Sequence, residues 1–460
     1  MAQPSLEDTI AAVSTPPGES GIGIVRLSGE QALGIVRAAF VSSRGRDPAS
    51  AKQRVFYGHV VDEQGEVLDE VLLHVMRGPH SYTREDVVEI NAHGGAAPLN
   101  AILERVLALG ARPAQPGEFT QRAFLNGRID LVQAEAVIDR IRARTRAGLK
   151  AAAAAAQGAL SQAINEMRAT LVEALARIEA ALDFPDEDLP DLVNDTLRAG
   201  LEGARARMRA LLDTAKTGRL YREGAGVAIA GRPNVGKSCL FNALLRDARA
   251  IVSAHPGTTR DRIEETITLS GIPVRLTDTA GLRTTRDEVE QIGIDVAREA
   301  VKKADVLLFV LDASEPVTDE DRALAQELRV HDVPVWVAWN KVDLSPDSVA
   351  PAWAAEFAGL TRLSAKTGEG LGEVEQALSK LLLGDARIAP NQGMLTRVHQ
   401  RDSLRRAADA LGSLLDNYDA SPEFLSIDLR EAISALGEIT GETTPEDVLD
   451  RIFASFCIGK

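Results

Sequence analysis

The spacing of apolar residues changes several times along this chain of 460 residues. In the first part, short apolar runs typical of strands alternate with stretches in which apolar residues recur every three or four positions, as in helices. We expect strands at 22–27, 55–61, 71–76 and 87–90, and helices at 30–40 and 98–109. The pattern predicts a small α+β domain over residues 1–126.

Helical spacing then dominates, and it returns at the end of the chain. Glycine and proline are scarce between Ile129 and Leu220, where alanine, a strong helix former, is abundant. In the last predicted helix, Thr444 is expected to cap the first turn and Pro445 to occupy the first helical position. We therefore expect long helices over residues 127–222 and 385–460.

Strand-like runs and helical stretches alternate between these two segments. The runs lie at 227–230, 263–269, 274–276, 306–311 and 333–339. Such alternation is typical of a nucleotide-binding α/β sheet. Because helical sequence lies on both sides, the simplest organisation is an α/β domain, residues 223–384, inserted into a helical domain.

Charge and composition narrow the class of protein. With 52 basic and 67 acidic residues, the formal net charge is −15, which argues against a surface that binds nucleic acid over a broad area. No apolar run approaches the ~18 residues of a membrane span, and the N-terminus lacks the features of a secretory signal. Two cysteines cannot form a disulfide framework, and Cys457, without an adjacent basic activator, is expected to be a buried structural residue. We expect a cytoplasmic protein.

Two groups of arginines in the helical segments could form local basic patches. The four from Arg140 to Arg146 recur at every second position of one predicted helix, which spreads them over two faces. The three from Arg397 to Arg405 recur at every fourth position and would share one face. For both groups we expect solvated side chains in preference to an RNA contact.

A glycine-rich segment follows the first run of the α/β segment. Residues 231–238 read GRPNVGKS and fit the phosphate-binding pattern Gly-x-x-x-x-Gly-Lys-Ser/Thr. Its glycines allow successive backbone N–H groups to approach phosphate oxygens, while Lys237 supplies positive charge and Ser238 a Mg²⁺ ligand. An ordinary glycine-proline turn is the alternative, and the motifs that follow argue against it.

Two of those motifs suit the phosphates. Residues 278–281, DTAG, close a strand, where the Asp278 carboxylate can hold the Mg²⁺ shell and the Gly281 N–H can approach a γ-phosphate. Residues 257–261, GTTRD, can supply the Thr259 hydroxyl to Mg²⁺ when the γ-phosphate is present. This part of the chain is therefore expected to act as a switch.

Two further motifs suit the base. In residues 340–343, NKVD, Asp343 can accept hydrogen bonds from N1–H and the exocyclic amine of guanine, a donor pair that adenine lacks. Residues 364–366, SAK, can complete the pocket with a backbone N–H. Because all the motifs occur in this order and at strand ends, we predict a GTP site.

The predicted GTP-binding residues lie in five segments of the chain. They are Asn234, Val235, Gly236, Lys237, Ser238, Cys239, Ser253, Ala254, His255, Pro256, Gly257, Thr258, Thr259, Asp278, Thr279, Ala280, Gly281, Asn340, Lys341, Asp343, Ser364, Ala365 and Lys366. We expect Lys237, Asp278 and Gly281 to act in catalysis. Leu282 stands where many small GTPases have the glutamine that orients the attacking water. Another group must therefore orient this water and neutralise the charge that develops during hydrolysis.

The guanine motifs resemble those of translation-factor-like GTPases, and other segments resemble one family among them. These segments are DTI at 8–10 followed by PPG at 16–18, RAFLNG at 122–127 and CIGK at 457–460. With the α/β domain between helical segments, the chain is similar from end to end to the tRNA-modification GTPase MnmE (TrmE) family. The resemblance implies a multidomain α+β and α/β fold. An N-terminal tetrahydrofolate-binding-like and dimerisation domain, 1–126, would precede a helical domain, 127–222 and 385–460, with an inserted P-loop, Ras-like GTPase domain, 223–384.

For catalysis, the resemblance implies a K⁺ ion that replaces an arginine finger as a fixed positive charge. Its ligands would be Asn234, Ser253, His255 and Thr258. The K⁺ loop of the family forms where two GTPase domains meet, so hydrolysis would require their dimerisation. Glu290 matches the water-orienting glutamate of the family, although on the residues alone an exposed first-turn helix position is an equal alternative.

The resemblance also implies a site for 5-formyl-tetrahydrofolate or a related one-carbon tetrahydrofolate. The matching positions are Arg26, Glu89, Arg128 and Lys460. A carboxylate suits the donor face of a pterin, and basic groups suit the carboxylates of the ligand. The family pattern has lysine where this chain has Arg128, and that exchange can change the contact geometry.

The implied function is K⁺-stimulated GTP hydrolysis by a homodimer. It would act with the FAD- and NADH-dependent partner MnmG (GidA), in a heterotetramer, in 5-(carboxymethyl)aminomethyl-type modification of the wobble uridine at position 34 of tRNAs. Two other classes remain open. A ribosome-assembly GTPase would carry an RNA-binding module such as a KH domain after the GTPase domain, where residues 385–460 predict helices. A non-catalytic GTP-dependent scaffold would show no K⁺-stimulated turnover.

Overall fold

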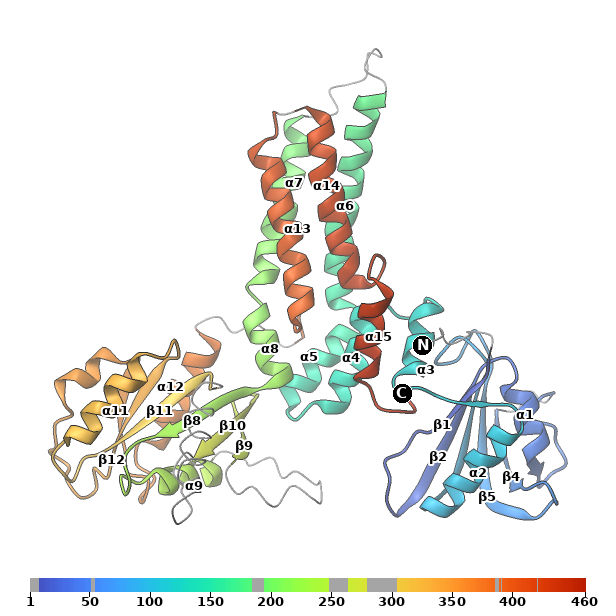
Figure 1. Ribbon diagram of the computed structural model, residues 1–460, viewed down its shortest axis with the longest axis horizontal. Coiled ribbons are helices and arrows are strands. Elements are labelled where there is room, and N and C mark those ends of the chain that lie inside the picture. The colour runs from blue at the N-terminus through green and yellow to red at the C-terminus, as the bar shows by residue number, and fades with distance from the viewer. Residues whose placement is uncertain are drawn as a thin grey trace. The chain divides into compact units, whose positions relative to one another are not determined.

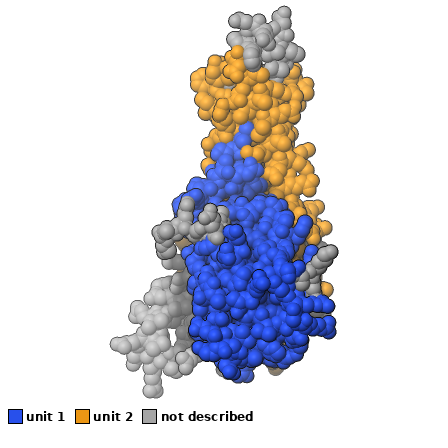
Figure 2. Space-filling view, turned by 90° about the vertical axis from the view of Figure 1, so that its right-hand side faces the viewer, with its two compact units in different colours: residues 1–138, 433–460 blue, residues 139–432 orange. Residues whose placement is uncertain are grey.

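The computed structural model describes residues 8–50, 54–183, 194–247, 264–278, 304–384, 389, 391–419 and 421–460. The chain forms two compact units, residues 1–138 with 433–460, and residues 139–432 (Figure 2). None of the described helices is long and apolar enough to cross a membrane. The multidomain α+β and α/β fold class is confirmed.

The first unit is built on a seven-stranded sheet in the order β3-β4-β5-β6-β2-β1-β7 (Figure 1). The strands are β1 Ile10–Val13, β2 Ser20–Ser28, β3 Phe40–Ser42, β4 Val55–Val61, β5 Val67–Met76, β6 Val87–Gly94 and β7 Arg112–Pro113. Helices α1, Ala32–Ala39, and α2, Ala96–Ala108, share one apolar core with the sheet. The four predicted strands and two predicted helices are confirmed, whereas β1, β3 and β7 were not predicted.

Two shorter helices of this unit, α3, Glu118–Leu125, and α15, Glu446–Ala454, carry the residues after the sheet and near the C-terminus. The expected cap of α15 is wrong by one position, because Pro445 is the N-cap and the Thr444 hydroxyl donates to the Glu438 carbonyl at 2.8 Å. The C-terminal CIGK segment lies against the end of β1. A Cβ on Gly459, where φ is +87°, would lie 2.8 Å from the Ser14 Cα, so only glycine fits.

Cys457, in the same segment, is exposed, so the expectation of a buried structural cysteine is wrong. The backbone of the segment is what the fold uses here. The Cys457 carbonyl accepts hydrogen bonds from the N–H groups of Gly117 and Lys460, both at 3.3 Å. The thiol can therefore face solvent while its backbone remains fixed.

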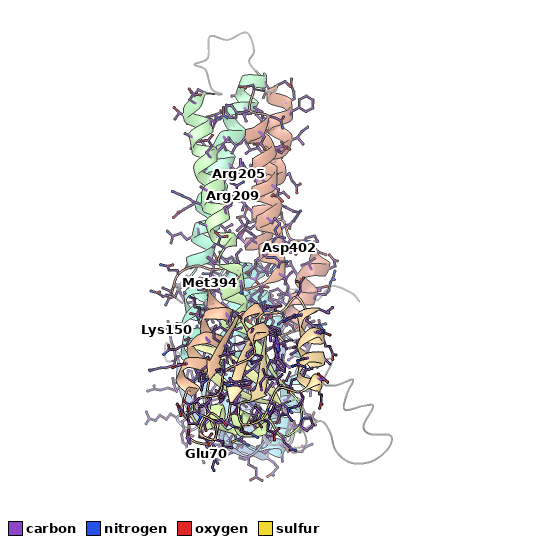
Figure 3. The ribbon with its side chains drawn as sticks, turned by 90° about the vertical axis from the view of Figure 1, so that its left-hand side faces the viewer. Glu70, Lys150, Arg205, Arg209, Met394 and Asp402 are labelled. Carbon is purple, nitrogen blue, oxygen red and sulfur yellow. The ribbon has the colours of Figure 1, made fainter. Side chains whose placement is uncertain are left out.

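Long helices make up one part of the second unit. They are α5 Arg146–Ala156, α6 Ala159–Asp183, α7 Asp195–Leu212, α8 Ala215–Glu223 and α13 Val398–Asp416, while α4 Leu131–Arg142 and α14 Pro422–Thr440 each have residues in both units. Helix α7, which carries Arg205 and Arg209, packs beside α13, which carries Asp402 (Figure 3). The close approach has a local cause, because the Arg205 guanidinium lies where a Cβ of residue 412 would be, and that residue is Gly412. Long helices are confirmed on both sides of the sheet sequence.

The two arginine groups differ from expectation in one respect each. The group from Arg140 to Arg146 is exposed, as expected, but a break before Thr145, the N-cap of α5, divides it between two helices. In the second group, Arg397 is largely buried and pairs with Asp139 at 2.9 Å, so it does not belong to a solvated face. An arginine at a helix N-terminus next to a buried carboxylate is a structural ion pair.

In the described residues, the second sheet has six strands in the order β13-β12-β11-β8-β10-β9. They are β8 Ala225–Ala230, β9 Glu264–Leu269, β10 Ile272–Asp278, β11 Val306–Asp312, β12 Val335–Asn340 and β13 Gly359–Arg362. All neighbouring pairs are parallel except β9 with β10. Apolar cores on its two faces include residues of α9, Lys237–Asp247, and α12, Leu371–Leu383, on one and of α11, Asp319–Arg329, on the other. Of these strands only β13 was not predicted.

Candidate functional site

The predicted phosphate and base motifs meet at one edge of the second sheet. Gly231 follows β8, Asp278 ends β10, Asn340 ends β12 and Ser364 follows β13. The carboxyl ends of parallel strands lie at the same edge, and β8 has β10 on one side and β11 on the other. Such a switch point in strand order is where α/β sheets bind ligands.

The glycine-rich loop is shaped by backbone conformations that favour glycine. Gly231 and Gly236 have φ of +152° and +101°, and Asn234, between them, has φ of +66°. A Cβ on Gly236 would lie 2.3 Å from the Asn340 Nδ2, so the loop can approach Asn340 only with glycine there. These conformations are of the kind in which successive backbone N–H groups can face a bound phosphate.

Lys237 begins α9 directly after this loop. Its side chain is buried, and its Nζ donates to the carbonyl oxygens of Gly231 and Arg232 at 2.8 and 2.6 Å. The ammonium group therefore folds back over the loop it is predicted to serve. This arrangement places positive charge beside the backbone N–H groups that would face phosphate oxygens.

Ser238 and Asp278, the described residues predicted for the Mg²⁺ shell, touch each other. The Ser238 hydroxyl donates to the Asp278 Oδ2 at 2.7 Å, and Asp278 is 6% exposed. Oxygen donors of this kind are those that Mg²⁺ takes in nucleotide sites. The donor set fits the ion.

Asn340 joins three of the motifs through one side chain that is 2% exposed. Its Nδ2 donates to the Val235 carbonyl in the loop at 2.8 Å, and its Oδ1 accepts from the Ala365 N–H at 2.9 Å. The Cys239 thiol of α9 also contacts the Ala365 carbonyl, at 3.5 Å. The phosphate loop and the two base motifs therefore form one hydrogen-bonded assembly.

The motifs did not include Asp312, which supports this assembly from the end of β11. Lys341, with φ of +70°, donates from Nζ to the Asn234 carbonyl at 2.8 Å and to the Asp312 Oδ2 at 2.5 Å. Burial alone would raise the pKa of Asp312, but hydrogen bonds from Lys341 and Ser314 hold it below its usual value. An aspartate at the carboxyl end of a buried strand is the signal that could have identified it.

Eleven of the predicted residues lie outside the described part of the chain. They are Ser253, Ala254, His255, Pro256, Gly257, Thr258, Thr259, Thr279, Ala280, Gly281 and Glu290. The described residues of the base pocket include the half-buried Asp343 and the fully buried Ser364.

Three of the residues predicted to bind a folate come together in the first unit. Arg26 and Glu89 are paired neighbours on β2 and β6, and the Arg26 Nε donates to the Glu89 Oε1 at 2.8 Å. The Arg26 Nη1 donates to the Gly459 carbonyl at 2.9 Å, which brings the end of the chain to the same place. Burial, helped by Arg26, lowers the pKa of Lys460. Arg128 has a different neighbour, the ring of Tyr82, whose centroid lies 4.8 Å from its Cζ.

Models of known protein families match both parts of the chain that carry these residues. The family model described as the MnmE helical domain matches residues 131–457, and the model described as the GTP-binding protein TrmE N-terminus matches residues 9–128. The chain belongs to the MnmE family.

Relatives with the MnmE name extend over nearly the whole chain. The tRNA modification GTPase MnmE of Heliobacterium modesticaldum is 47% identical and covers 98% of this chain and 99% of its own. The protein with the same name from Chloroflexus aurantiacus is 48% identical, over 99% of this chain and 100% of its own. The solved G domain of the FeoB iron transporter of T. maritima is 28% identical and covers 34% of this chain and 98% of its own, with a TM-score of 0.26, too low to carry an argument.

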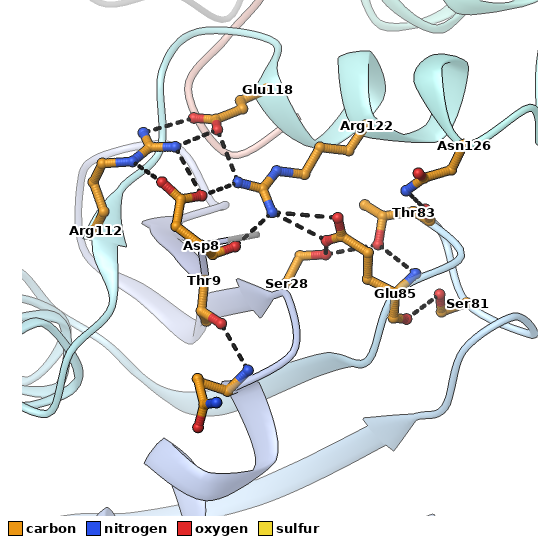
Figure 4. A network of polar contacts seen from close by, with 11 residues as sticks. Asp8, Thr9, Ser28, Ser81, Thr83, Glu85, Arg112, Glu118, Arg122 and Asn126 are labelled. Carbon is orange, nitrogen blue, oxygen red and sulfur yellow. Dashed lines mark hydrogen bonds and ion pairs between the residues drawn. The ribbon is translucent and has the colours of Figure 1, made fainter. Parts of the chain in front are cut away.

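An ion-pair network that the motifs did not reveal lies in the N-terminal part of this MnmE-family chain (Figure 4). Arg122 of α3, 1% exposed, pairs with Asp8, Glu85 and Glu118 at 2.5, 3.3 and 3.2 Å. Arg112 joins Asp8 to Glu118 from the other side, at 2.7 and 2.6 Å. The network ties α3 to the loop before β6. In the sequence Arg122 is only one letter of the family-like string RAFLNG, and nothing there marks it as buried.

Proposed function

We propose that the chain is a K⁺-stimulated GTP hydrolase that acts in tRNA modification. The observation that carries the proposal is the Asn340 assembly, in which the phosphate loop and both base motifs are joined by hydrogen bonds at one sheet edge. Membership of a family whose relatives are named tRNA modification GTPase supports the same reaction. The regular elements described between residues 391 and 460 are the helices α13, α14 and α15, which leaves a KH-containing ribosome-assembly GTPase without support.

Each described residue of the site has a task in this reaction. Loop N–H groups and Lys237 bind the β- and γ-phosphates. Ser238, with Thr259, would hold Mg²⁺, and Asp278 would hold its water shell. Asp343 accepts from the two guanine donors, while Asn340 keeps the base motif against the phosphate loop.

The second ion and the attacking water complete the proposed mechanism. Asn234, Ser253, His255 and Thr258 would hold K⁺. Among them, Asn234 lies in the described part of the chain, is exposed, and carries an amide oxygen, a suitable neutral ligand. When bound, the two ions supply positive charge beside the phosphates. Glu290 would orient the water in place of the glutamine that Leu282 replaces. The Gly281 N–H would approach the γ-phosphate.

The first unit is proposed to bind 5-formyl-tetrahydrofolate or a related one-carbon tetrahydrofolate. Arg26 and Lys460 bring two positive charges to a place where Glu89 supplies one negative charge, so a further anionic group is favoured there. The second carboxylate oxygen of Glu89, which has no hydrogen-bond partner among the described residues, suits the donor face of a pterin. The donor set therefore fits a folate, and Arg128 would receive a carboxylate of its tail.

The wider assembly follows from the family alone. We propose a cytoplasmic homodimer that acts with the FAD- and NADH-dependent partner MnmG in a heterotetramer. The reaction would be 5-(carboxymethyl)aminomethyl-type modification of uridine 34 of tRNAs. Residues 1–126, 127–222, 223–384 and 385–460 are the proposed folate-binding and dimerisation, helical, GTPase and second helical parts.

Two measurements test the proposal, one for GTP hydrolysis and one for the role in tRNA modification. GTP turnover of the full chain with Mg²⁺ should rise when Na⁺ is replaced by K⁺ at constant ionic strength. Absence of turnover in both salts would leave a GTP-dependent scaffold as the better description. Nucleoside analysis of tRNA from cells lacking the protein should show loss of the modified wobble uridine, and an unchanged nucleoside profile would overturn the role in tRNA modification.

A further inference from the structure

Arg128 is an exposed arginine whose guanidinium rests on an aromatic ring. Its Cζ lies 4.8 Å from the centroid of the Tyr82 ring. Among the residues that the structure describes, no carboxylate pairs with this guanidinium and no side-chain hydrogen bond holds it. All its N–H donors are therefore available to a ligand, while the ring restricts the rotamers that an exposed arginine would otherwise sample.

The ring is itself held in place. The Tyr82 hydroxyl is 3.0 Å from the hydroxyl of Thr120, which is fully buried in α3. The ring also packs against the apolar cluster that includes Phe119, the neighbouring residue of α3. The ring of Tyr82 is thus held by the contact of its hydroxyl with Thr120 and by packing against this cluster, so its position does not depend on Arg128.

The turn that carries Arg128 is attached to the loop that carries Tyr82. The Asn126 side chain donates from Nδ2 to the Thr83 carbonyl at 2.7 Å, a pair visible in Figure 4. In the opposite direction, the Arg84 Nη1 donates to the Asn126 carbonyl at 2.8 Å. These two bonds involve residues close in sequence to Tyr82 and Arg128, so the segment that carries the ring is attached to the segment that carries the guanidinium.

The same helix supports the other arginine proposed to bind the ligand. The Arg26 Cζ lies 5.6 Å from the centroid of the Phe119 ring. Arg26 already donates to Glu89 and to the Gly459 carbonyl. Arg128, in contrast, has no hydrogen-bond partner for its side chain in the described part of the chain, which suits it to a ligand group that arrives from solution.

We propose that Tyr82 is a positioning residue that holds Arg128 in the orientation in which it receives a carboxylate from the glutamate tail of the folate. The inference rests on the folate binding proposed above. It also gives a reason for arginine at a position where the family pattern has lysine. A planar guanidinium can stack on a ring and still present two parallel donors to a carboxylate, whereas a compact ammonium cannot do both.

The test uses the full chain and two ligands that differ only in the tail. These are 5-formyl-tetrahydrofolate and 5-formyl-tetrahydropteroate, which lacks the glutamate. In isothermal titration, Tyr82→Leu should weaken binding of the folate about tenfold, the order expected when a cation–π contact and the preset rotamer are lost. Binding of the pteroate should change less than about twofold. Tyr82→Phe, which keeps the ring and loses only the hydroxyl, should bind the folate nearly as the unaltered chain does.

A double-mutant cycle separates this role from general destabilisation. Arg128→Lys should weaken folate binding about as much as Tyr82→Leu, and the double variant should be little weaker than either, because both changes remove one interaction. Additive losses would overturn the proposal, as would equal losses for folate and pteroate. If Tyr82→Leu does not fold, as judged by thermal unfolding, Arg128→Lys remains a test of the proposal. This variant must bind the folate more weakly and the pteroate equally well, and any other result would overturn the proposal.

The outcome also distinguishes this inference from the proposal on which it rests. If the unaltered chain binds neither ligand, folate binding is wrong and the role of Tyr82 falls with it. If the unaltered chain binds the folate but Tyr82→Leu binds it equally well, only the role of Tyr82 is wrong.

Discussion

Replacement of Asn340 by alanine tests whether the nucleotide site depends on the assembly around this side chain. The change removes two hydrogen bonds and leaves the Val235 carbonyl and the Ala365 N–H without their partner in a buried place. Each buried group left unsatisfied costs about 1–3 kcal/mol, so the arranged loop is destabilised by about 2–6 kcal/mol. If the loop relaxes in the free protein, nucleotide binding has to restore the arrangement against this cost.

The expected consequence is a large loss of nucleotide affinity. A cost of about 2–6 kcal/mol corresponds to a factor between about 30 and more than 10⁴ in the dissociation constant. Partial relaxation reduces the factor, so we expect at least a tenfold rise in the dissociation constant of GDP. Titration calorimetry with GDP measures it without hydrolysis, and thermal unfolding of the free protein reports how far the fold has relaxed.

Asn242→Ala is the matched control. The Asn242 amide also bonds to the site, donating to the Ser238 carbonyl at 2.8 Å, but it is exposed and water can replace it. We expect less than a threefold effect from this change. A dissociation constant for Asn340→Ala within threefold of the unaltered chain would refute the reasoning, because the two buried bonds would then contribute nothing to the loop that binds phosphate.

Four further predictions concern the two sites. Asp343→Asn should exchange preference from GTP to xanthosine triphosphate by about 10²-fold or more, since the amide then faces a carbonyl instead of an amine; competition binding measures this, and retained GTP preference would remove Asp343 from the base pocket. Glu290→Ala should keep GTP affinity and lose about 10²-fold or more in turnover in K⁺, as for other positioned groups that assist proton transfer; unchanged turnover would reject its role. Gly459→Ala, which places a Cβ 2.8 Å from the Ser14 Cα, should weaken folate binding at least tenfold in titration calorimetry, and normal binding would show that the tail is not part of the site. Because burial lowers the pKa of Lys460, the protonated form that attracts an anion is lost at a lower pH than for a free lysine; folate affinity should fall as pH rises through that lowered pKa, and Lys460→Arg should remove this dependence.

The sheets were largely predictable because their strands are long enough to show a period. Strand β4 alternates between exposed and buried residues, and β8 and β11 are continuous buried runs, so apolar spacing locates all three. Strands β3, β7 and β13 have four residues or fewer, too short to establish any spacing. Strand β7 pairs with β1, near the start of the chain, whereas β3 and β13 pair with the adjacent strands β4 and β12.

Within the sites, the motif residues could be predicted from the sequence, but the residues that hold them in position could not. Ser238, Asp278 and Asn340 occur in strings whose chemistry can be worked out from residue type and order. Asp312 and Tyr82 act by contacts with residues about 30 to 50 positions away, which no local string encodes. The exposure of Cys457 was misjudged for the same reason, because burial is decided by packing and not by the residues beside it in the chain.

The distance in sequence between Asn340 and the loop it holds has a consequence for folding. The Asn340–Val235 hydrogen bond joins residues separated by 105 positions. The second partner of the Asn340 side chain, the Ala365 N–H, comes later still, from the segment after β13. The loop can therefore acquire its final shape only after β12 and the segment after β13 are in place, so it forms late and cooperatively with the sheet. Nucleotide that binds only this complete arrangement stabilises the whole sheet by mass action. GDP should then slow hydrogen exchange in β12 and β13 as well as in the loop that touches it.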